Sequence, residues 1–332
     1  MTGRELDAPG PVSGLDRLAL GGAALGNLFR GASDEVARAT VDAAWGLGVR
    51  RFDTAPHYGL GLSERRLGAA LRDRPRAAYT LSTKVGRLLL PDPRPGDDLA
   101  DGFAVPATHR RVWDFSADGV RRSLEESLER LGLDRVDTVY LHDPDDHAEQ
   151  AFREGYPALE RLRAEGTVAR IGAGMNQSAM LARFVRDTDV DEVLCAGRYT
   201  LLDQSAAADL LPAAHARGTS VVLGGVFNSG LLADPGPDAT YDYAQAPPEL
   251  LARARKLSEL AGRYGLTLRA AALAFPRAHP AVTTVLVGAR TPEEVRDAVA
   301  QASSRVPDDY WKEARAEGLL PEGVPVPTGE PS

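Results

Sequence analysis

The sequence predicts a single (β/α)8 barrel, and three observations carry that prediction. Eight short, mostly apolar runs alternate with longer amphipathic stretches along the 332 residues, a pattern typical of parallel strands covered by helices. The count of eight runs and the chain length favour a closed barrel over a doubly wound sheet. The segment Leu20–Gly26 after the first run also lacks the GxGxxG spacing of a Rossmann phosphate loop.

The expected strands are short and apolar, as strands buried on both faces of a sheet are. In chain order they are Asp16–Leu20, Arg50–Phe52, Tyr79–Thr83, Asp137–Leu141, Ala169–Ala173, Glu192–Ala196, Ser220–Leu223 and Thr284–Val287. Three of the intervening helices have clear starts, because Ser33, Ser116 and Thr291 are residues whose side chains cap first turns. Thr291 is followed by a proline and two acidic residues, which strengthens that prediction.

Two segments interrupt the alternation. Leu88–Phe115 is long and proline-rich, so we expect a functional loop over the C-terminal end of the barrel, or a partly mobile one. Asp234–Pro248 has a similar composition. The end of the chain, Pro321–Ser332, has little to bury and is expected to fray. We therefore expect one domain over residues 1–332, with a core at about 15–318 and a flexible tail at 319–332.

Composition and charge exclude several classes of function. The chain has 39 Lys and Arg against 47 Asp and Glu, a net charge of −8, which disfavours a nucleic-acid or anionic-membrane binder. No apolar run approaches the roughly 20 residues of a membrane span. The first residues contain no apolar segment of a secretory signal, so a cytoplasmic location is expected.

Cysteine and histidine usage gives no sign of a metal site. The lone Cys195 cannot form an internal disulfide or a cysteine-based cluster, and we expect it to be a small core residue. His109, His147, His215 and His279 show no metal-ligand spacing, so no metal is expected.

Polar side chains follow four of the expected strands, at the barrel end where active sites lie. Asp53 follows the second strand, Lys84 the third, His142 the fourth and Asn176 the fifth, and Tyr58 lies in the loop after Asp53. Each alone is typical of an ordinary structural role, such as an ion pair or a packed ring. Together at one rim they indicate an active site.

The run FDTAPHYGLGLSERRLGAAL (52–71) resembles the signature of the aldo-keto reductase superfamily, and the likeness extends from about residue 15 to about 298. Asp53, Tyr58, Lys84 and His142 match the catalytic tetrad of that family. Four further segments, 114–145, 196–204, 224–233 and 287–295, resemble its sugar-oxidising branch, which includes L-fucose and D-threo-aldose 1-dehydrogenases and the similar pyridoxal 4-dehydrogenases.

The resemblance implies a division of labour within the tetrad. Tyr58 would be the general acid and base. A tyrosine with a pKa near 10 is a poor base at neutral pH, so the Lys84 ammonium is expected to move its pKa toward the working range. Asp53 would hold and neutralise Lys84, and His142 would orient the substrate oxygen. The hydride would come from or go to a nicotinamide cofactor.

The resemblance also implies an extended dinucleotide across the barrel rim. Asn176 would contact the carboxamide, the loop 224–231 would cradle the pyrophosphate through backbone N–H groups, and the helix start at Thr291 would hold the adenosine end. The full set of expected contacts is Gly21, Gly22, Asp53, Asn176, Gly224, Gly225, Phe227, Ser229, Gly230, Leu231, Gly288, Arg290 and Glu294.

Two positions depart from the wider superfamily. Ala196 stands where many members have a glutamine, and Gly224 stands where many have a tyrosine under the nicotinamide, with Phe227 as its expected replacement. Glu293 and Glu294 would disfavour a 2′-phosphate, so NAD is favoured over NADP, although Arg290 would accommodate either.

The resemblance leaves three functions open. The first is oxidation of an aldose of the L-fucose or D-threo-aldose type at C1 to a lactone, with Tyr58, Trp113, His142 and Arg198 as substrate contacts. The second is pyridoxal oxidation or general NADPH-dependent reduction of aldehydes and ketones. The third, of another class, is a cofactor-binding regulatory subunit. The expected partner is a small carbonyl or sugar, and the oligomeric state is left open.

Overall fold

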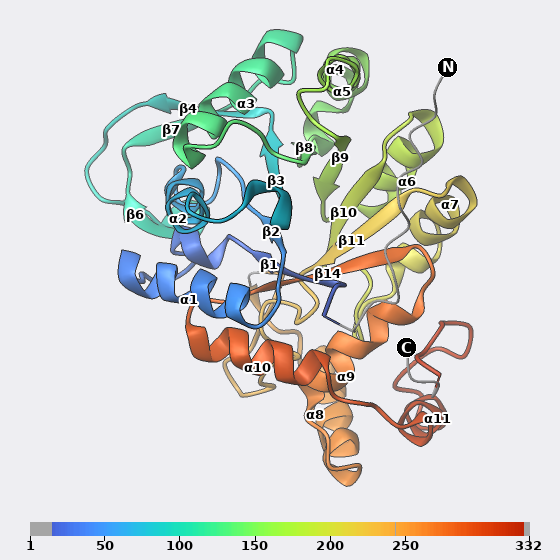
Figure 1. Ribbon diagram of the computed structural model, residues 1–332. Helices are drawn as coiled ribbons and strands as arrows, with labels where there is room; N and C mark the ends of the chain where they lie inside the picture. The colour runs from blue at the N-terminus through green and yellow to red at the C-terminus, as the bar shows by residue number, and fades with distance from the viewer. Residues whose placement is uncertain (1–14, 243, 329–332) are drawn as a thin grey trace.

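The computed structural model describes residues 15–242 and 244–328, which build a closed barrel of eight parallel strands (Figure 1). Neighbours around the barrel follow the order β1-β14-β11-β10-β9-β8-β3-β2. The barrel strands are β1 (Leu18–Gly21), β2 (Arg51–Asp53), β3 (Thr80–Val85), β8 (Thr138–His142), β9 (Arg170–Met175), β10 (Glu192–Ala196), β11 (Ser220–Gly224) and β14 (Val282–Gly288). Each coincides with a predicted strand to within a few residues, so the predicted barrel is confirmed.

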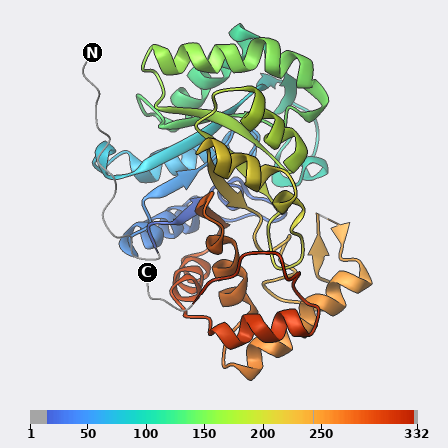
Figure 2. The ribbon, with the colours of Figure 1, turned by 90° about the vertical axis from the view of Figure 1, so that its right-hand side faces the viewer.

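Helices surround the strands on the outside (Figure 1, Figure 2). They are α1 (Asp34–Gly46), α2 (Leu62–Leu71), α3 (Ala117–Leu131), α4 (Ala148–Gln150), α5 (Tyr156–Ala164), α6 (Ser178–Asp187), α7 (Leu210–Arg217), α8 (Pro248–Arg263), α9 (Leu268–Ala274), α10 (Pro292–Ala302) and α11 (Asp308–Ala316). The three predicted caps are confirmed. Ser33, Ser116 and Thr291 each accept a hydrogen bond from a backbone N–H in the first turn of α1, α3 and α10.

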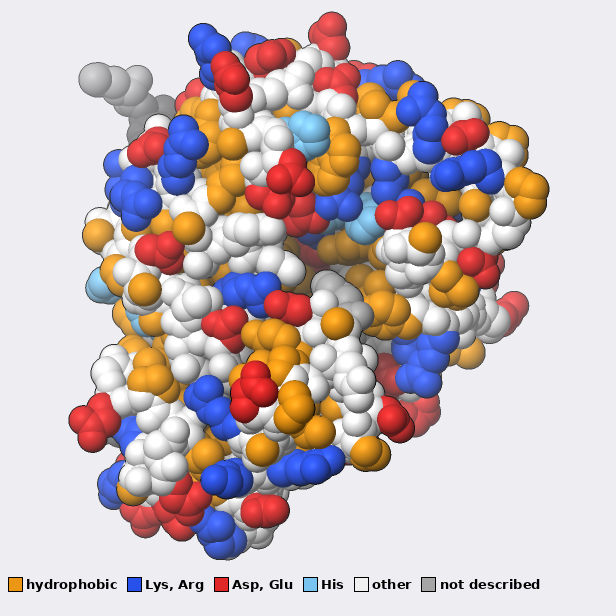
Figure 3. Space-filling model, turned by 180° about the vertical axis from the view of Figure 1, so that it is seen from behind, with side chains coloured by type: hydrophobic (Ala, Val, Ile, Leu, Met, Phe, Trp, Pro, Cys, Tyr) orange, Lys and Arg blue, Asp and Glu red, His pale blue; other side chains and the backbone are white. Residues whose placement is uncertain are grey.

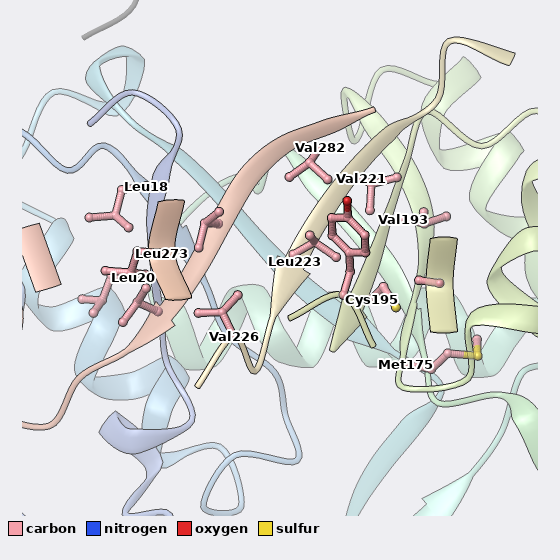
Figure 4. Close-up of a cluster of buried hydrophobic side chains, with 14 of the residues drawn as sticks. Leu18, Leu20, Met175, Val193, Cys195, Val221, Leu223, Val226, Leu273 and Val282 are labelled. Carbon is pink, nitrogen blue, oxygen red and sulfur yellow. The ribbon is translucent and has the colours of Figure 1, made fainter. Parts of the chain in front are cut away.

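The hydrophobic core has an outer and an inner part. The outer part fills the space between strands and helices, and Figure 4 shows side chains of β10, β11 and β14 within it. Cys195 is fully buried there, as predicted. The inner part lies inside the barrel and centres on Tyr140, Leu194 and Val222. Filling the barrel with side chains makes it a rigid platform for the groups at its rim.

The segment predicted as a long loop at 88–115 instead forms two small antiparallel pairs. β4 (Arg87–Pro91) pairs with β7 (His109–Trp113), and β5 (Asp97–Asp98) pairs with β6 (Phe103–Pro106). The apolar side chains within the segment drive this order, because Leu89 and Phe103 are buried against Leu60 of the loop that carries Tyr58. The two ends of the insertion meet where Asp114 N–H donates to Gly86 O at 3.0 Å.

Two further expectations change. Part of the segment 234–248 forms a short hairpin of β12 (Thr240–Tyr241) and β13 (Ala244–Gln245). The tail expected to be flexible from residue 319 packs against the barrel instead, because Leu319, Leu320 and Val324 are buried. Arginines also bind the carbonyls of Leu319 and Val324. Residues 329–332 lie outside the described part of the chain, as do residues 1–14.

Within the ranges that the structure describes, no helix is both long and apolar enough to cross a membrane.

Candidate active site

A buried ion pair lies at the C-terminal end of the barrel. Lys84 Nζ on β3 donates to Asp53 Oδ2 on β2 at 2.6 Å and to Thr54 O at 2.9 Å. The other carboxylate oxygen of Asp53 accepts from Ser82 Oγ at 2.7 Å. Both charged side chains are almost fully buried. Burial lowers the pKa of Lys84, but the opposing charges of Asp53 and Tyr58 outweigh it and leave the pKa raised. Lys84 is therefore a fixed cation.

Tyr58 and His142 lie beside this cation. Lys84 Nζ is 4.7 Å from the centre of the Tyr58 ring, and the rings of Tyr58 and His142 meet edge to face with centres 5.9 Å apart. Burial lowers the pKa of His142 well below its usual value, with help from the positive charges of Arg87 and Lys84. His142 is therefore neutral at physiological pH, and its Nδ1 is buried without a partner among the described residues.

The pKa of Tyr58 differs from the sequence expectation. Burial of the phenol raises it to about 12, and Lys84 only partly offsets that rise. The charge of Lys84 alone would lower the pKa of Tyr58, but burial disfavours the phenolate more strongly here. Tyr58 is thus a proton donor at neutral pH, ready to protonate an alkoxide that forms beside it.

The loop that carries Tyr58 is held by a close backbone contact. Gly59 has a φ of +63°, and a Cβ built there would lie 2.2 Å from Gly26 O. A Cβ on Gly26 would lie 2.6 Å from the Tyr58 carbonyl carbon. Glycine is therefore required on both sides, since any side chain would push the loops apart. Ser63 Oγ adds a hydrogen bond to Gly22 O at 2.7 Å.

A cavity of ≈ 530 Å³ extends from the tetrad across the rim, within the range of cofactor sites. Figure 3 shows the hollow on the surface, with acidic, basic and histidine side chains at its edge. The described residues that line it include twelve of the thirteen expected cofactor contacts, namely Gly21, Gly22, Asp53, Asn176, Gly224, Gly225, Phe227, Ser229, Gly230, Gly288, Arg290 and Glu294. The structure thus brings together residues from both halves of the chain.

Leu231 is the exception among the expected contacts. Its side chain is fully buried in the hydrophobic core, and its N–H already donates to Asn228 O at 3.2 Å. It therefore has neither a surface nor a free donor to offer to a pyrophosphate.

The cavity fits an extended dinucleotide on chemical grounds. A Cβ added at Gly230 or Gly288 would meet no atom within 4 Å, so a ligand can approach the backbone closely there. Asn228 lies in the loop 224–231 that was expected to cradle the pyrophosphate, and it has a φ of +47° and a buried Oδ1 without a partner among the described residues. Arg30 and Arg290 provide positive charge, and Arg290 N–H donates to Glu294 Oε2 at 2.7 Å.

The two expected substrate contacts outside the tetrad have different surroundings. Arg198 forms a double hydrogen bond with Asp242, at 3.0 and 2.8 Å, so its guanidinium is already engaged. It does not line the cavity in the described structure. Trp113 on β7 is 39% exposed and covers the Arg87 guanidinium at 4.1 Å. Arg87 in turn pairs with Asp143, directly after His142, which brings Trp113 close to the tetrad.

A larger cavity of ≈ 700 Å³ lies at the opposite, N-terminal end of the barrel and is lined by arginines such as Arg17, Arg51 and Arg277. It holds none of the tetrad residues. Because barrel enzymes place their chemistry at the C-terminal ends of the strands, the smaller cavity is the candidate active site.

Comparisons with known proteins agree with this geometry. The model of the aldo/keto reductase family matches residues 17–316. The D-threo-aldose 1-dehydrogenase of a Pseudomonas species is 47% identical over 92% of this chain and 94% of its own length. The pyridoxal 4-dehydrogenase of Microbacterium luteolum is 40% identical over 91% of this chain and 94% of its own.

Solved structures give the same result. An aldo-keto reductase from Bacillus halodurans in its holo form superimposes with a TM-score of 0.71 at 25% identity, covering 93% of each chain. A glycerol dehydrogenase from Gluconobacter oxydans shares the fold, with a TM-score of 0.72 at 24% identity over 98% of this chain and 96% of that one. With the tetrad, the glycine-lined cavity and these matches in place, the chain belongs to the aldo/keto reductase family and is an oxidoreductase that uses a nicotinamide cofactor.

Proposed function

We propose that this oxidoreductase oxidises an aldose at C1 to a lactone, with NAD as its preferred cofactor. The observation that carries the proposal is the Asp53–Lys84 pair beside Tyr58 and His142, at the end of a cavity that fits a dinucleotide. The choice of an aldose rests on the 47% identity to a D-threo-aldose 1-dehydrogenase over nearly the whole of both chains.

The four residues have distinct tasks in this reaction. A bound nicotinamide supplies the hydride acceptor, or the hydride donor in the reverse direction. His142 is neutral and hydrogen-bonds the C1 oxygen, which orients the sugar for transfer. Tyr58 accepts the proton of the C1 hydroxyl during oxidation and returns it to the oxygen during reduction. Lys84 stabilises the phenolate that this requires, and Asp53 keeps Lys84 charged and in place.

The charges at the adenosine end of the cavity favour NAD over NADP. Glu294 lines the cavity beside Arg290, at the start of α10. A carboxylate there repels a 2′-phosphate but accepts hydrogen bonds from a ribose diol. Arg30 and Arg290 supply the positive charge that the diphosphate needs.

A second candidate substrate is pyridoxal, because a pyridoxal 4-dehydrogenase is 40% identical over most of both chains. An aromatic aldehyde would use the same four residues. Trp113, exposed beside the tetrad, supports either an aromatic ring or the apolar face of a sugar.

The test is absorbance of the reduced nicotinamide with NAD and NADP separately. L-fucose, D-arabinose, L-galactose, pyridoxal and simple aldehydes form the panel. We expect the highest kcat/KM with NAD and an aldose, and loss of turnover in Tyr58→Phe. Faster turnover of simple aldehydes with NADPH would refute the aldose assignment. Cofactor binding without turnover of any compound would favour the third function, a cofactor-binding regulatory subunit.

A further inference from the structure

His57, the neighbour of Tyr58, is held by an arginine of the insertion. Arg111 Nε–H on β7 donates to His57 Nδ1 at 2.6 Å, and Arg111 Nη2 donates to His57 O at 3.1 Å. The two residues lie 54 positions apart, and no local sequence pattern connects them. Strand pairing places Arg111 on the same face of the β4–β7 hairpin as Leu89, the face that packs over the Tyr58 loop.

Every donor of Arg111 is used in this contact and its support. Nη1 donates to Asp98 Oδ1 and Asp101 Oδ2, both at 2.9 Å, and Nη2 donates to Asp98 Oδ2 at 2.5 Å. With the two bonds to His57, this makes five hydrogen bonds for the five N–H groups of a guanidinium. Arg111 therefore has no donor left for a substrate, and its effect must pass through His57.

The bond from Arg111 fixes the proton of the His57 ring. A guanidinium can only donate, so Nδ1 must carry a lone pair and the ring proton must be on Nε2. Burial lowers the pKa of His57 to about 2, and the positive charges of Arg87, Arg111 and Lys84 add to this effect. His57 thus stays neutral, in a single tautomer, across the physiological pH range.

The remaining donor lies beside the reacting groups. The His57 ring centre is 5.7 Å from that of His142 and 6.1 Å from that of Tyr58. His57 is partly exposed, and its Nε2 has no hydrogen-bond partner among the described residues. Since Tyr58 and His142 are the proposed partners of the reacting oxygen, the adjacent His57 ring is near enough to bind a second polar group close to that oxygen.

We propose that His57 donates a hydrogen bond from Nε2 to an oxygen on the carbon next to the reacting carbon, with Arg111 as the positioning residue that sets the tautomer. For an aldose, which rests on the proposed function, this oxygen is the C2 hydroxyl. The site then selects 2-hydroxy carbonyl compounds and their lactols over substrates without that oxygen.

The test compares substrates that differ by this one oxygen. D-arabinose and 2-deoxy-D-ribose form the pair for oxidation, and lactaldehyde and propionaldehyde form the pair for reduction. We expect the wild-type protein to prefer the hydroxylated member in kcat/KM by about tenfold or more. His57→Phe should bring both ratios close to one. His57→Gln, which keeps an N–H donor, should restore part of the preference.

Arg110→Met serves as a matched control, because Arg110 lies on the same strand, is exposed and faces away from His57. It should leave both ratios unchanged. An unchanged ratio in His57→Phe would overturn the proposal. Equal losses of kcat/KM for lactaldehyde and propionaldehyde would also overturn it, since they would indicate a purely structural role.

The two pairs separate this inference from the proposed function. If no aldose is oxidised but the lactaldehyde preference disappears in His57→Phe, the aldose assignment fails and the role of His57 stands. If D-arabinose is oxidised with the same preference in both proteins, the proposed function stands and the role of His57 fails. No turnover of either pair would overturn the role of His57, and no turnover of any aldose in the panel would overturn the proposed function as well.

Discussion

Breaking the buried Asp53–Lys84 pair should lower the stability of the protein as well as its activity. In Asp53→Asn the Lys84 ammonium would face a neutral amide and would keep only neutral partners, Thr54 O and the Tyr58 hydroxyl, among the described residues. Both side chains are at most 4% exposed, so water cannot replace the lost charge. Removing one member of such a pair costs about 3–5 kcal/mol of unfolding free energy.

The size of the effect in a melting experiment follows from the chain length. With 332 residues, an unfolding entropy of about 2.1 cal/mol/K per residue makes 1 kcal/mol equal to about 1.4 °C. Asp53→Asn should therefore lower Tm by about 4–7 °C, measured by circular dichroism. A matched control is Asp187→Asn, which removes an exposed pair with Arg183 on α6 and should lower Tm by less than about 1.5 °C.

A double variant tests the physical cause. Adding Lys84→Met to Asp53→Asn removes the uncompensated charge, so part of the lost stability should return although activity does not. If Asp53→Asn melts within about 1–2 °C of the wild-type protein, which is about the size of the control effect, an uncompensated buried charge is not the cause. The same conclusion follows if the double variant melts well below the single one.

Four further predictions follow from the same structure. Burial raises the pKa of Tyr58 to about 12, so the phenolate fraction should rise about tenfold per pH unit between about pH 7 and 10. The initial rate of oxidation should rise with it, whereas the rate of reduction should stay nearly constant. A flat pH profile of oxidation would contradict this assignment. Glu294→Gln should raise kcat/KM with NADP relative to NAD by about tenfold, and an unchanged ratio would place the carboxylate away from the 2′ position. Gly26→Ala should displace Tyr58 and lower kcat, measured by steady-state kinetics, about 100-fold. A wild-type kcat in this variant would show that the close contact between Gly26 and the Tyr58 loop is not required. Leu320→Ala should lower the free energy of unfolding, measured with urea, by about 2–3 kcal/mol. An unchanged urea midpoint would indicate that residue 320 belongs to a flexible tail.

The barrel was predictable because its signals are local. Each of the eight strands is a short apolar run, and each of the three predicted caps lies directly before its helix. Asp53, Lys84 and His142 follow from those strands, since the ends of parallel strands meet at one rim.

The insertion and the electrostatics of the site were not predictable in this way. Pairing of Arg87 with Trp113 joins residues on either side of a proline-rich stretch, and nothing local indicates it. The tautomer of His57 is set by Arg111, and the pairing of β4 with β7 brings Arg111 within hydrogen-bond distance of that ring. The pKa of Tyr58 depends on how much protein surrounds the phenol, and charge counting along a sequence contains no such information.

The insertion between β3 and α3 begins and ends at one backbone hydrogen bond, from Asp114 to Gly86. Its length and content can therefore change during evolution without displacing the strands that hold Asp53 and Lys84. A chimera that exchanges residues 87–113 with those of a relative would replace Arg111 and Trp113 together, and with them Arg87 and Phe103, which contact Asp143 and Tyr58. The insertion therefore joins the proposed substrate contacts and part of the packing around Tyr58 and His142 in one continuous segment.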